Sequence, residues 1–241
     1  MQQKKGKEEK ILKFNNPELD RRIGGIPLPS LTLIEGPNNS GKSVIVQQLS
    51  WSALNSGYNV VYITSEETPK GLISHMEELS WKVLDYYLIG QFRITALHIR
   101  GIKWNSEVSR FYLLGLQNFI NRLIVKYKIF VIDSLTYLIT YAIKQDILEF
   151  FSELRNLVDL KDATFFVTIH PYAVEEDMLI RIRSISDGHF LLSIKHFHNR
   201  NVMVLNVAKL RGASRTSDSI VSFDIDPVMG IKVLPFSFAR A

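Results

Sequence analysis

The sequence predicts an α/β fold with a mostly parallel central sheet flanked by helices, and with antiparallel hairpins at the C-terminal end. Two observations predict it. Along most of the chain, unbroken apolar strand patterns alternate with amphipathic helix patterns, as expected for a parallel sheet whose strands are buried on both faces. After Asp187 the pattern changes to paired strands joined by short polar turns, which is typical of antiparallel hairpins.

Five short apolar runs predict the strands of the parallel part. Each is rich in Val, Ile, Leu, Tyr or Phe, the composition of a strand that is buried on both faces. The carboxyl ends of such strands meet at one edge of the sheet, where ligands of α/β folds bind. The runs lie at residues 31–35, 59–64, 92–98, 129–133 and 164–169.

Between these strands, apolar residues recur at intervals of three or four and predict amphipathic helices. The first helix spans residues 42–56. The second begins at Thr68, as its N-cap, with Pro69 as its first helical residue. We expect Ser106 to cap a third helix, and the apolar stripe over residues 147–158 predicts a fourth.

Two hairpins are expected in the last quarter of the chain. Alternating apolar and polar residues with turn residues between them are the signal. The first is expected to pair residues 189–197 with 201–207 around Asn199, and the second to pair 219–225 with 231–236.

Composition points to a single folded domain. Of the 241 residues, 46% are hydrophobic and 22% are charged, which is ordinary for a globular domain. We expect one domain over residues 14–241 after a mobile charged tail at residues 1–13. The chain has no cysteine, which excludes disulfide scaffolds, thiol nucleophiles and cysteine-ligated zinc. Without a signal peptide or a bilayer-spanning run, we expect a cytoplasmic protein that is peripheral to a membrane only through other proteins.

The positive charge is concentrated in one segment. The chain carries 29 Lys and Arg against 24 Asp and Glu, a net charge of +5. Residues 188–217 contain no acidic residue, and their cations account for the whole excess. These cations are Lys195, Arg200, Lys209, Arg211 and Arg215. An anionic partner is therefore expected at this segment.

A phosphate-binding pattern, GxxxxGK[ST], lies between the first strand and the first helix. Its glycines allow backbone N–H groups to turn toward phosphate, and the helix N-terminus adds a positive dipole. We expect Lys42 to reach the β- and γ-phosphates and the Ser43 hydroxyl to hold Mg²⁺. The loop consists of Gly36, Pro37, Asn38, Asn39, Ser40, Gly41, Lys42 and Ser43.

Carboxylates follow two other strands. Asp133 ends the run FVID, and such an Asp is often only a helix cap. Beside a phosphate loop, however, a second Mg²⁺ ligand acting through water is needed, and Asp133 ends the best-placed later strand. Glu66 and Glu67 follow the second strand. They are either solvated acids near a helix N-terminus or a general base that polarises the water attacking the γ-phosphate, and their place at a strand end favours the second interpretation.

Three further residues have two interpretations each. Lys209 and Arg211 are two apart on a strand, so they either form an exposed rim or address one phosphate group. In ring-forming ATPases a cation supplied in trans neutralises transition-state charge on the neighbour's nucleotide. His170 ends the strand at residues 164–169 and is either structural or a sensor of the γ-phosphate.

Together these motifs resemble the RecA-like superfamily of P-loop NTPases, and more narrowly the KaiC-like ATPases. The resemblance covers residues 14–236, and the run VTIHPYA at residues 167–173 is most similar to the single-domain accessory ATPases of the archaellum, the archaeal flagellum. The other runs that carry it are NPELD at 16–20, GGIP at 24–27, GPNNSGKS at 36–43, TSEETP at 64–69, FVID at 130–133, SDGHFLL at 186–192 and KLRGAS at 209–214.

The resemblance implies a role for each site residue. Lys42 and Ser43 would bind ATP and Mg²⁺, Asp133 would complete the metal site, and Glu66 with Glu67 would occupy the catalytic glutamate positions. Lys209 and Arg211 would act across a subunit interface of a homo-hexamer. These roles belong to a nucleotide-gated ring or regulator that works with the archaellum motor ATPase and scaffold proteins in cell motility, and in which ATP hydrolysis is slow or absent.

Two features of the phosphate loop differ from the pattern of these relatives, and one competing function has the same fold and loop. Residues 38–40 are Asn-Asn-Ser where clock-type relatives are richer in glycine, and Ser43 replaces the commoner Thr, which leaves the hydrolysis rate open. A RecA/RadA-type DNA recombinase paralogue, a DNA-dependent ATPase, has the same fold and phosphate loop. It needs basic DNA-binding loops, whereas residues 175–177 after His170 are acidic and repel phosphate, so nucleic acid is not the expected partner.

Overall fold

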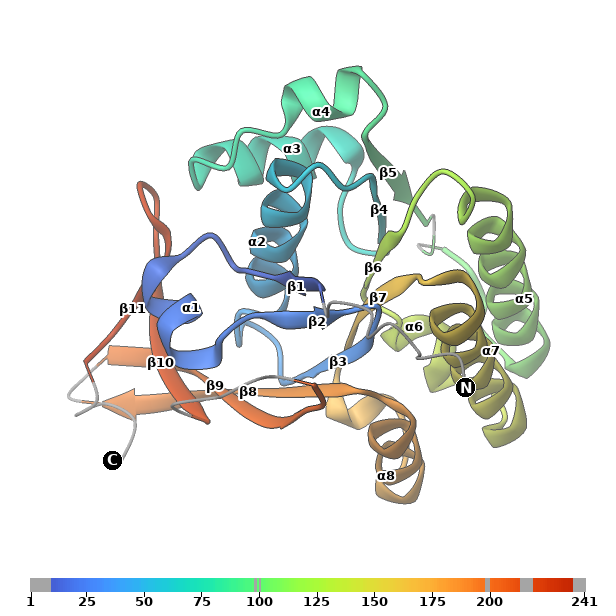
Figure 1. Cartoon of the computed structure of the whole chain (residues 1–241). Helices are drawn as coiled ribbons and strands as arrows, with labels where there is room; N and C mark the ends of the chain where they lie inside the picture. The colour runs from blue at the N-terminus through green and yellow to red at the C-terminus, as the bar shows by residue number, and fades with distance from the viewer. Residues whose placement is uncertain (1–9, 98, 100, 198–199, 213–218, 236–241) are drawn as a thin grey trace, which may run out of the picture.

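The structure is a computed structural model that describes residues 10–97, 99, 101–197, 200–212 and 219–235. Strands and helices alternate through most of the chain, and helices lie on both sides of a central sheet (Figure 1). The strands are β1 (Lys10–Leu12), β2 (Ile26–Leu28), β3 (Leu31–Glu35), β4 (Val60–Thr64), β5 (Phe92–Ala96), β6 (Ile129–Asp133), β7 (Thr164–Ile169), β8 (Gly188–Phe197), β9 (Arg200–Leu210), β10 (Ile220–Asp226) and β11 (Gly230–Val233). The helices are α1 (Pro17–Ile23), α2 (Lys42–Asn55), α3 (Pro69–Glu78), α4 (Leu84–Leu88), α5 (Ser106–Leu123), α6 (Thr136–Thr140), α7 (Lys144–Lys161), the 3₁₀ helix η1 (Pro171–Ala173) and α8 (Glu176–Ile185).

The central sheet confirms the predicted fold class. Its strand order is β11-β10-β9-β8-β3-β7-β6-β4-β5. The pairs from β8 to β5 are parallel, and the pairs from β8 to β11 are antiparallel. The first C-terminal hairpin is part of this sheet, because β8 pairs in parallel with β3. Since β3, β4, β6 and β7 run the same way, their carboxyl ends meet at one edge.

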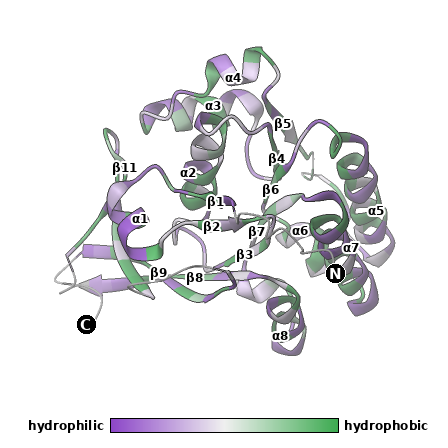
Figure 2. Ribbon diagram, in the orientation of Figure 1, coloured by the Kyte–Doolittle hydropathy of each residue, from purple (hydrophilic) through white to green (hydrophobic). Residues whose placement is uncertain are grey.

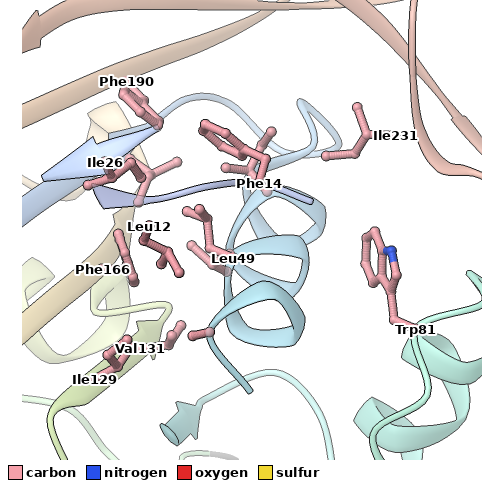
Figure 3. Close-up of a cluster of buried hydrophobic side chains, with 14 of the residues drawn as sticks. Leu12, Phe14, Ile26, Leu49, Trp81, Ile129, Val131, Phe166, Phe190 and Ile231 are labelled. Carbon is pink, nitrogen blue, oxygen red and sulfur yellow. The ribbon is translucent and has the colours of Figure 1, made fainter. Parts of the chain in front are cut away.

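Alternate residues of the central strands face opposite layers of helices. Val131 and Phe166 belong to the buried cluster on the side of α1, α2 and α3, together with Leu49 of α2 (Figure 3). Their neighbours Phe130 and Phe165 belong to the cluster on the side of α5, α6, α7 and α8. Figure 2 shows both hydrophobic and hydrophilic residues along α5 and α7, as expected for helices with one face on the sheet. None of the helices in the described ranges is long and apolar enough to cross a membrane.

Several boundaries differ from the predicted ones. Helix α5 is capped by Asn105 and not by Ser106, because the Asn105 side chain accepts a hydrogen bond from the backbone N–H of Val108 (2.9 Å). The strand expected over residues 92–98 ends at Ala96, and His98 lies outside the described residues. Helices α1, α4, α6 and α8 were not predicted.

The folded part of the chain also begins earlier than residue 14. Residues 10–12 form β1, which pairs antiparallel with β2, and the Leu12 side chain is buried. The expected tail therefore does not extend to residue 13, since residues 10–12 are part of the fold. Residues 1–9 lie outside the described residues, as do Asn199, Arg215 and the end of the second expected hairpin at residue 236.

Candidate nucleotide-binding site

The phosphate loop connects β3 to α2 at the carboxyl edge of the sheet, as predicted. Two positions of the motif admit only glycine here. A Cβ atom at Gly36 would lie 2.7 Å from the backbone oxygen of Leu192. Gly41 has φ +91°, in the left-handed region, and a Cβ atom there would lie 2.9 Å from the ring of Phe223. The spacing of the glycines thus follows from the backbone conformation and from contacts with β8 and β10.

Lys42 is folded over this loop. Its Nζ donates a hydrogen bond to the backbone oxygen of Pro37 (2.7 Å), and the Ser40 hydroxyl donates to the same oxygen (2.8 Å). Burial lowers the pKa of Lys42, while the carboxylates of Asp133 and Glu66 act in the opposite direction. The ammonium group is therefore held above the loop, within the electrostatic influence of Asp133 at the end of β6 and of Glu66 in the turn after β4. From this position it can turn to a phosphate group.

Asp133 receives three hydroxyl groups. Ser43 donates to its Oδ1 atom at 3.3 Å and Thr168 donates to the same atom at 2.6 Å. Tyr62 donates to its Oδ2 atom at 2.7 Å. The side chain of Tyr62 is buried, and burial followed by the charge of Asp133 raises its pKa. The structure thus brings Ser43 and Asp133 together as predicted. A hydroxyl beside a carboxylate is an oxygen donor set that suits Mg²⁺, so these residues fit the expected metal.

The two glutamates point to different partners. The backbone N–H groups of Glu66 and Glu67 both donate to the Thr64 hydroxyl at 3.1 Å, which fixes the turn after β4. The Glu66 carboxylate accepts a hydrogen bond from the Ser134 hydroxyl (3.2 Å), and burial followed by the charge of Asp133 raises its pKa. The Glu67 carboxylate instead lies 2.9 Å from His75 Nδ1 on α3. Glu66 therefore shares the electrostatic surroundings of Lys42 and Asp133.

His170 lies at the end of β7 and is neutral near pH 7. Burial, and then the charge of Lys42, lower its pKa to about 4. Its backbone N–H donates to the Thr136 hydroxyl (3.1 Å), which lies 2.8 Å from His170 Nδ1. If the hydroxyl donates its own hydrogen to Nδ1, the Nε2–H remains as a donor for a ligand. The imidazole also stacks on Tyr172, with 5.2 Å between ring centroids.

The cation pair does not join this site within one chain. Gly188 of β8 pairs with Thr32 on one side and with Leu210 on the other, so Lys209 and Arg211 lie level with the beginning of β3, opposite its carboxyl end. Lys209 Nζ donates to the backbone oxygens of Arg183 (3.0 Å) and Ser184 (3.1 Å) at the end of α8. Arg211 lines a cavity of about 740 Å³ at the amino ends of β3, β6 and β7.

Four residues of the site escaped prediction: Tyr62, Ser134, Thr136 and Thr168. Each reaches a site residue by a hydrogen bond that joins segments far apart in the sequence. The sequence carries a signal for two of them, since Tyr62 and Thr168 each place a hydroxyl between apolar residues of a strand. A buried hydroxyl needs a partner, and the end of a neighbouring strand is where that partner lies.

Comparisons with known proteins agree on one family. The model of the family described as "ATPase: KaiC" matches residues 13–237. The archaeal flagellar ATP-binding protein FlaH of Sulfolobus acidocaldarius is 37% identical over 231 residues, which is 96% of this chain and 100% of the relative. FlaH of Methanocaldococcus jannaschii is 24% identical over 225 residues, or 91% of this chain and 93% of the relative.

Two solved structures share the fold. The crystal structure of the flagellar accessory protein FlaH from Methanocaldococcus jannaschii superimposes with a TM-score of 0.81 at 23% identity, covering 95% of this chain and 100% of that one. A KaiC-like protein from Pyrococcus horikoshii superimposes with a TM-score of 0.72 at 22% identity, covering 94% of this chain and 100% of that one. Both likenesses span nearly the whole chain, so the fold is shared as a unit.

Proposed function

We propose that this chain, which belongs to the KaiC family of ATPases and within it to the archaeal flagellar ATP-binding proteins called FlaH, binds Mg·ATP. We propose further that it does so as a component of the archaellum motor. The observation that carries the proposal is the meeting of Lys42, Ser43 and Asp133. Ser43 and Asp133 are 90 residues apart in the sequence, yet the Ser43 hydroxyl and the Asp133 carboxylate are within hydrogen-bond distance.

ATP binding would use groups that the structure already orients. The Lys42 ammonium would exchange the Pro37 carbonyl for phosphate oxygens, and the N–H groups at the start of α2 would donate hydrogen bonds to the β-phosphate. Ser43 and Asp133 would hold Mg²⁺, which when bound neutralises charge on the phosphate oxygens. Glu66 would orient the attacking water and accept its proton.

We propose that hydrolysis is slow or absent in the isolated chain and that ATP acts mainly as a switch. Lys209 and Arg211 lie at the amino end of β3, so one chain cannot place them on its own γ-phosphate. In a closed homo-hexamer, each subunit would present this pair to the nucleotide of its neighbour. Bound ATP would then stabilise the ring, and its charge would match the basic segment at residues 188–217.

The ring would act on the archaellum motor ATPase and on scaffold proteins at the cytoplasmic side of the membrane. The support for these partners is the flagellar role that the names of the FlaH relatives record. The acidic residues Glu175 and Asp177 after η1 both contact Lys144, and this segment remains a poor surface for DNA.

Sizing the protein with Mg·ATP, with Mg·ADP and without nucleotide, while measuring phosphate release, tests the proposal. We expect a ring only with Mg·ATP, and little phosphate release in any of the three conditions. Rapid phosphate release from a species that stays monomeric would contradict both the ring and the role of the cation pair.

A further inference from the structure

The carboxylate of Asp133 accepts hydrogen bonds from side chains of both neighbouring strands. Strand β6 lies between β4 and β7 in the sheet. Tyr62 on β4 donates to Oδ2 at 2.7 Å, and Thr168 on β7 donates to Oδ1 at 2.6 Å. Thus each oxygen atom of the carboxylate has its own donor from a different strand.

The strand registers explain why these two hydroxyls reach Asp133. Val131 pairs with Tyr62 on one side and with Phe166 on the other. Asp133 and Thr168 each follow by two residues, so all three polar side chains project from the face of the sheet that α2 covers. Tyr62 reaches its partner along the strand because its ring is long, whereas Thr168 lies directly beside it.

Burial makes these two contacts consequential. Tyr62 and Thr168 are both 0% exposed and Asp133 is 5% exposed. A carboxylate away from water is stable in its charged form only when donors satisfy it, and hydrogen bonds to a charged group are about twice as strong as those between neutral groups. The third donor, Ser43, is farther away at 3.3 Å and is the one that the metal would need.

We infer that Tyr62 and Thr168 are positioning residues for the magnesium site, and that their two hydroxyls fix the charged Asp133 carboxylate in place before Mg·ATP arrives. The inference rests on the proposed function, because it concerns the metal of that same site. When Ser43 turns its hydroxyl toward the metal, Asp133 keeps its other two donors, and these hold its carboxylate in the same orientation. In the described part of the chain both hydroxyls donate to Asp133 and not to Lys42 or the backbone of the phosphate loop, so their loss should affect metal binding more than metal-free nucleotide binding.

Loss of either hydroxyl should therefore weaken Mg²⁺ binding specifically. Tyr62→Phe removes one oxygen atom and leaves the ring in place, and Thr168→Val replaces a hydroxyl by a methyl group. For each variant we expect the Mg²⁺ concentration that supports half-maximal ATP binding to rise about tenfold, the scale of one hydrogen bond to a charged group. ATP affinity in excess chelator should stay at the wild-type value.

Matched controls lie elsewhere in the same sheet region. Tyr127 is also buried, and its hydroxyl donates to the Gly90 backbone oxygen (2.8 Å), away from the phosphate loop. Thr164 is buried at the opposite end of β7. Tyr127→Phe and Thr164→Val remove the same atoms without touching Asp133, and both should retain the wild-type Mg²⁺ requirement.

The experiment is a calorimetric titration of ATP into each protein at a series of free Mg²⁺ concentrations and in chelator, with circular dichroism to establish folding. A selective rise in the Mg²⁺ requirement of Tyr62→Phe and Thr168→Val supports the inference. The inference is overturned if both variants need the same Mg²⁺ concentration as the wild type, or if each loses ATP affinity equally with and without Mg²⁺. Unfolding of both variants also overturns it. Each of these outcomes gives the two hydroxyls no role that is particular to the metal. If the wild-type protein shows no Mg²⁺-dependent ATP binding at all, the proposed function fails instead.

Discussion

Arg183→Met is expected to destabilise the fold strongly, because Arg183 neutralises a carboxylate directly before the phosphate loop. Glu35 is the last residue of β3 and is 1% exposed. Arg183 on α8 donates to both of its oxygens, at 2.9 and 2.6 Å, and His189 Nε2 lies 3.1 Å from one of them. Methionine keeps most of the arginine volume but leaves the buried charge without the partner that donates to both of its oxygens.

The magnitude follows from the pKa of Glu35. Burial alone would raise this pKa, but the hydrogen bonds from His189 and Arg183 outweigh burial and lower it from 4.5 to about 2. That shift corresponds to about 3 kcal/mol of stability at neutral pH and is shared by His189 and Arg183. Removing one partner of a buried ion pair costs about 3–5 kcal/mol, because the other charge is left unpaired, and we take the lower figure since His189 remains. Because the folded pKa is depressed, this contribution is fully present above pH 4.5 and is lost as the pH falls from 4.5 toward 2.

Urea unfolding followed by circular dichroism measures the effect. At pH 7 we expect Arg183→Met to lower the free energy of unfolding by about 3 kcal/mol, and we expect the difference from wild type to shrink between pH 4.5 and pH 3. Arg21→Met is the control, since Arg21 pairs with Glu18 on the surface and the change should be below about 1 kcal/mol. A loss below 1 kcal/mol for Arg183→Met, or a loss that does not depend on pH, would refute the reasoning.

Two further predictions concern turnover. Glu66→Gln should abolish residual phosphate release without weakening ATP binding, because it removes the carboxylate that we propose as the proton acceptor. Glu67→Gln should leave release near the wild-type rate, since the Glu67 carboxylate is paired with His75. The reverse result in a single-turnover assay would assign the water to Glu67. Lys42→Ala chains and Arg211→Ala chains should each release no phosphate when assayed alone. A mixture of the two should regain part of the wild-type phosphate release, because some interfaces then join an intact Lys42 of one subunit to an intact Arg211 of the next. A mixture no more active than its components would contradict an active site shared between subunits.

The parts of the site that were predicted are local in the sequence. The phosphate loop is one continuous motif, and Asp133 was expected because it ends an apolar strand. Tyr62 and Thr168 could not be assigned, because their partner depends on the strand order β7-β6-β4, which the sequence does not display. The interface role of Arg211 came from resemblance, and the structure adds only its place at the far end of β3.

For the fold as well, elements with a local signal in the sequence were predicted, and contacts between distant segments were not. The main strands and long helices were predicted from local signals, namely apolar spacing and the residues that start helices. Helix α8 was missed because its first turn carries Glu176 and Asp177, which favour a helix N-terminus as much as an acidic loop. The cap of α5 moved by one residue, since Asn105 and Ser106 are both good N-caps and only the backbone decides between them. The pairing of Arg183 with Glu35 joins segments 148 residues apart and has no local signal.

The most direct test of the central claim is the binding of Mg·ATP to the wild-type chain and to Lys42→Ala. Lys42 is the side chain that the structure folds over the phosphate loop, where its ammonium group donates to the Pro37 backbone oxygen, outside the strands of the sheet. In calorimetry with Mg²⁺ present, the wild type should bind one ATP per chain, and Lys42→Ala should bind at least about a hundredfold more weakly while remaining folded. Equal ATP affinity in the two proteins, or no saturable binding to the wild type, would contradict a nucleotide site at this loop.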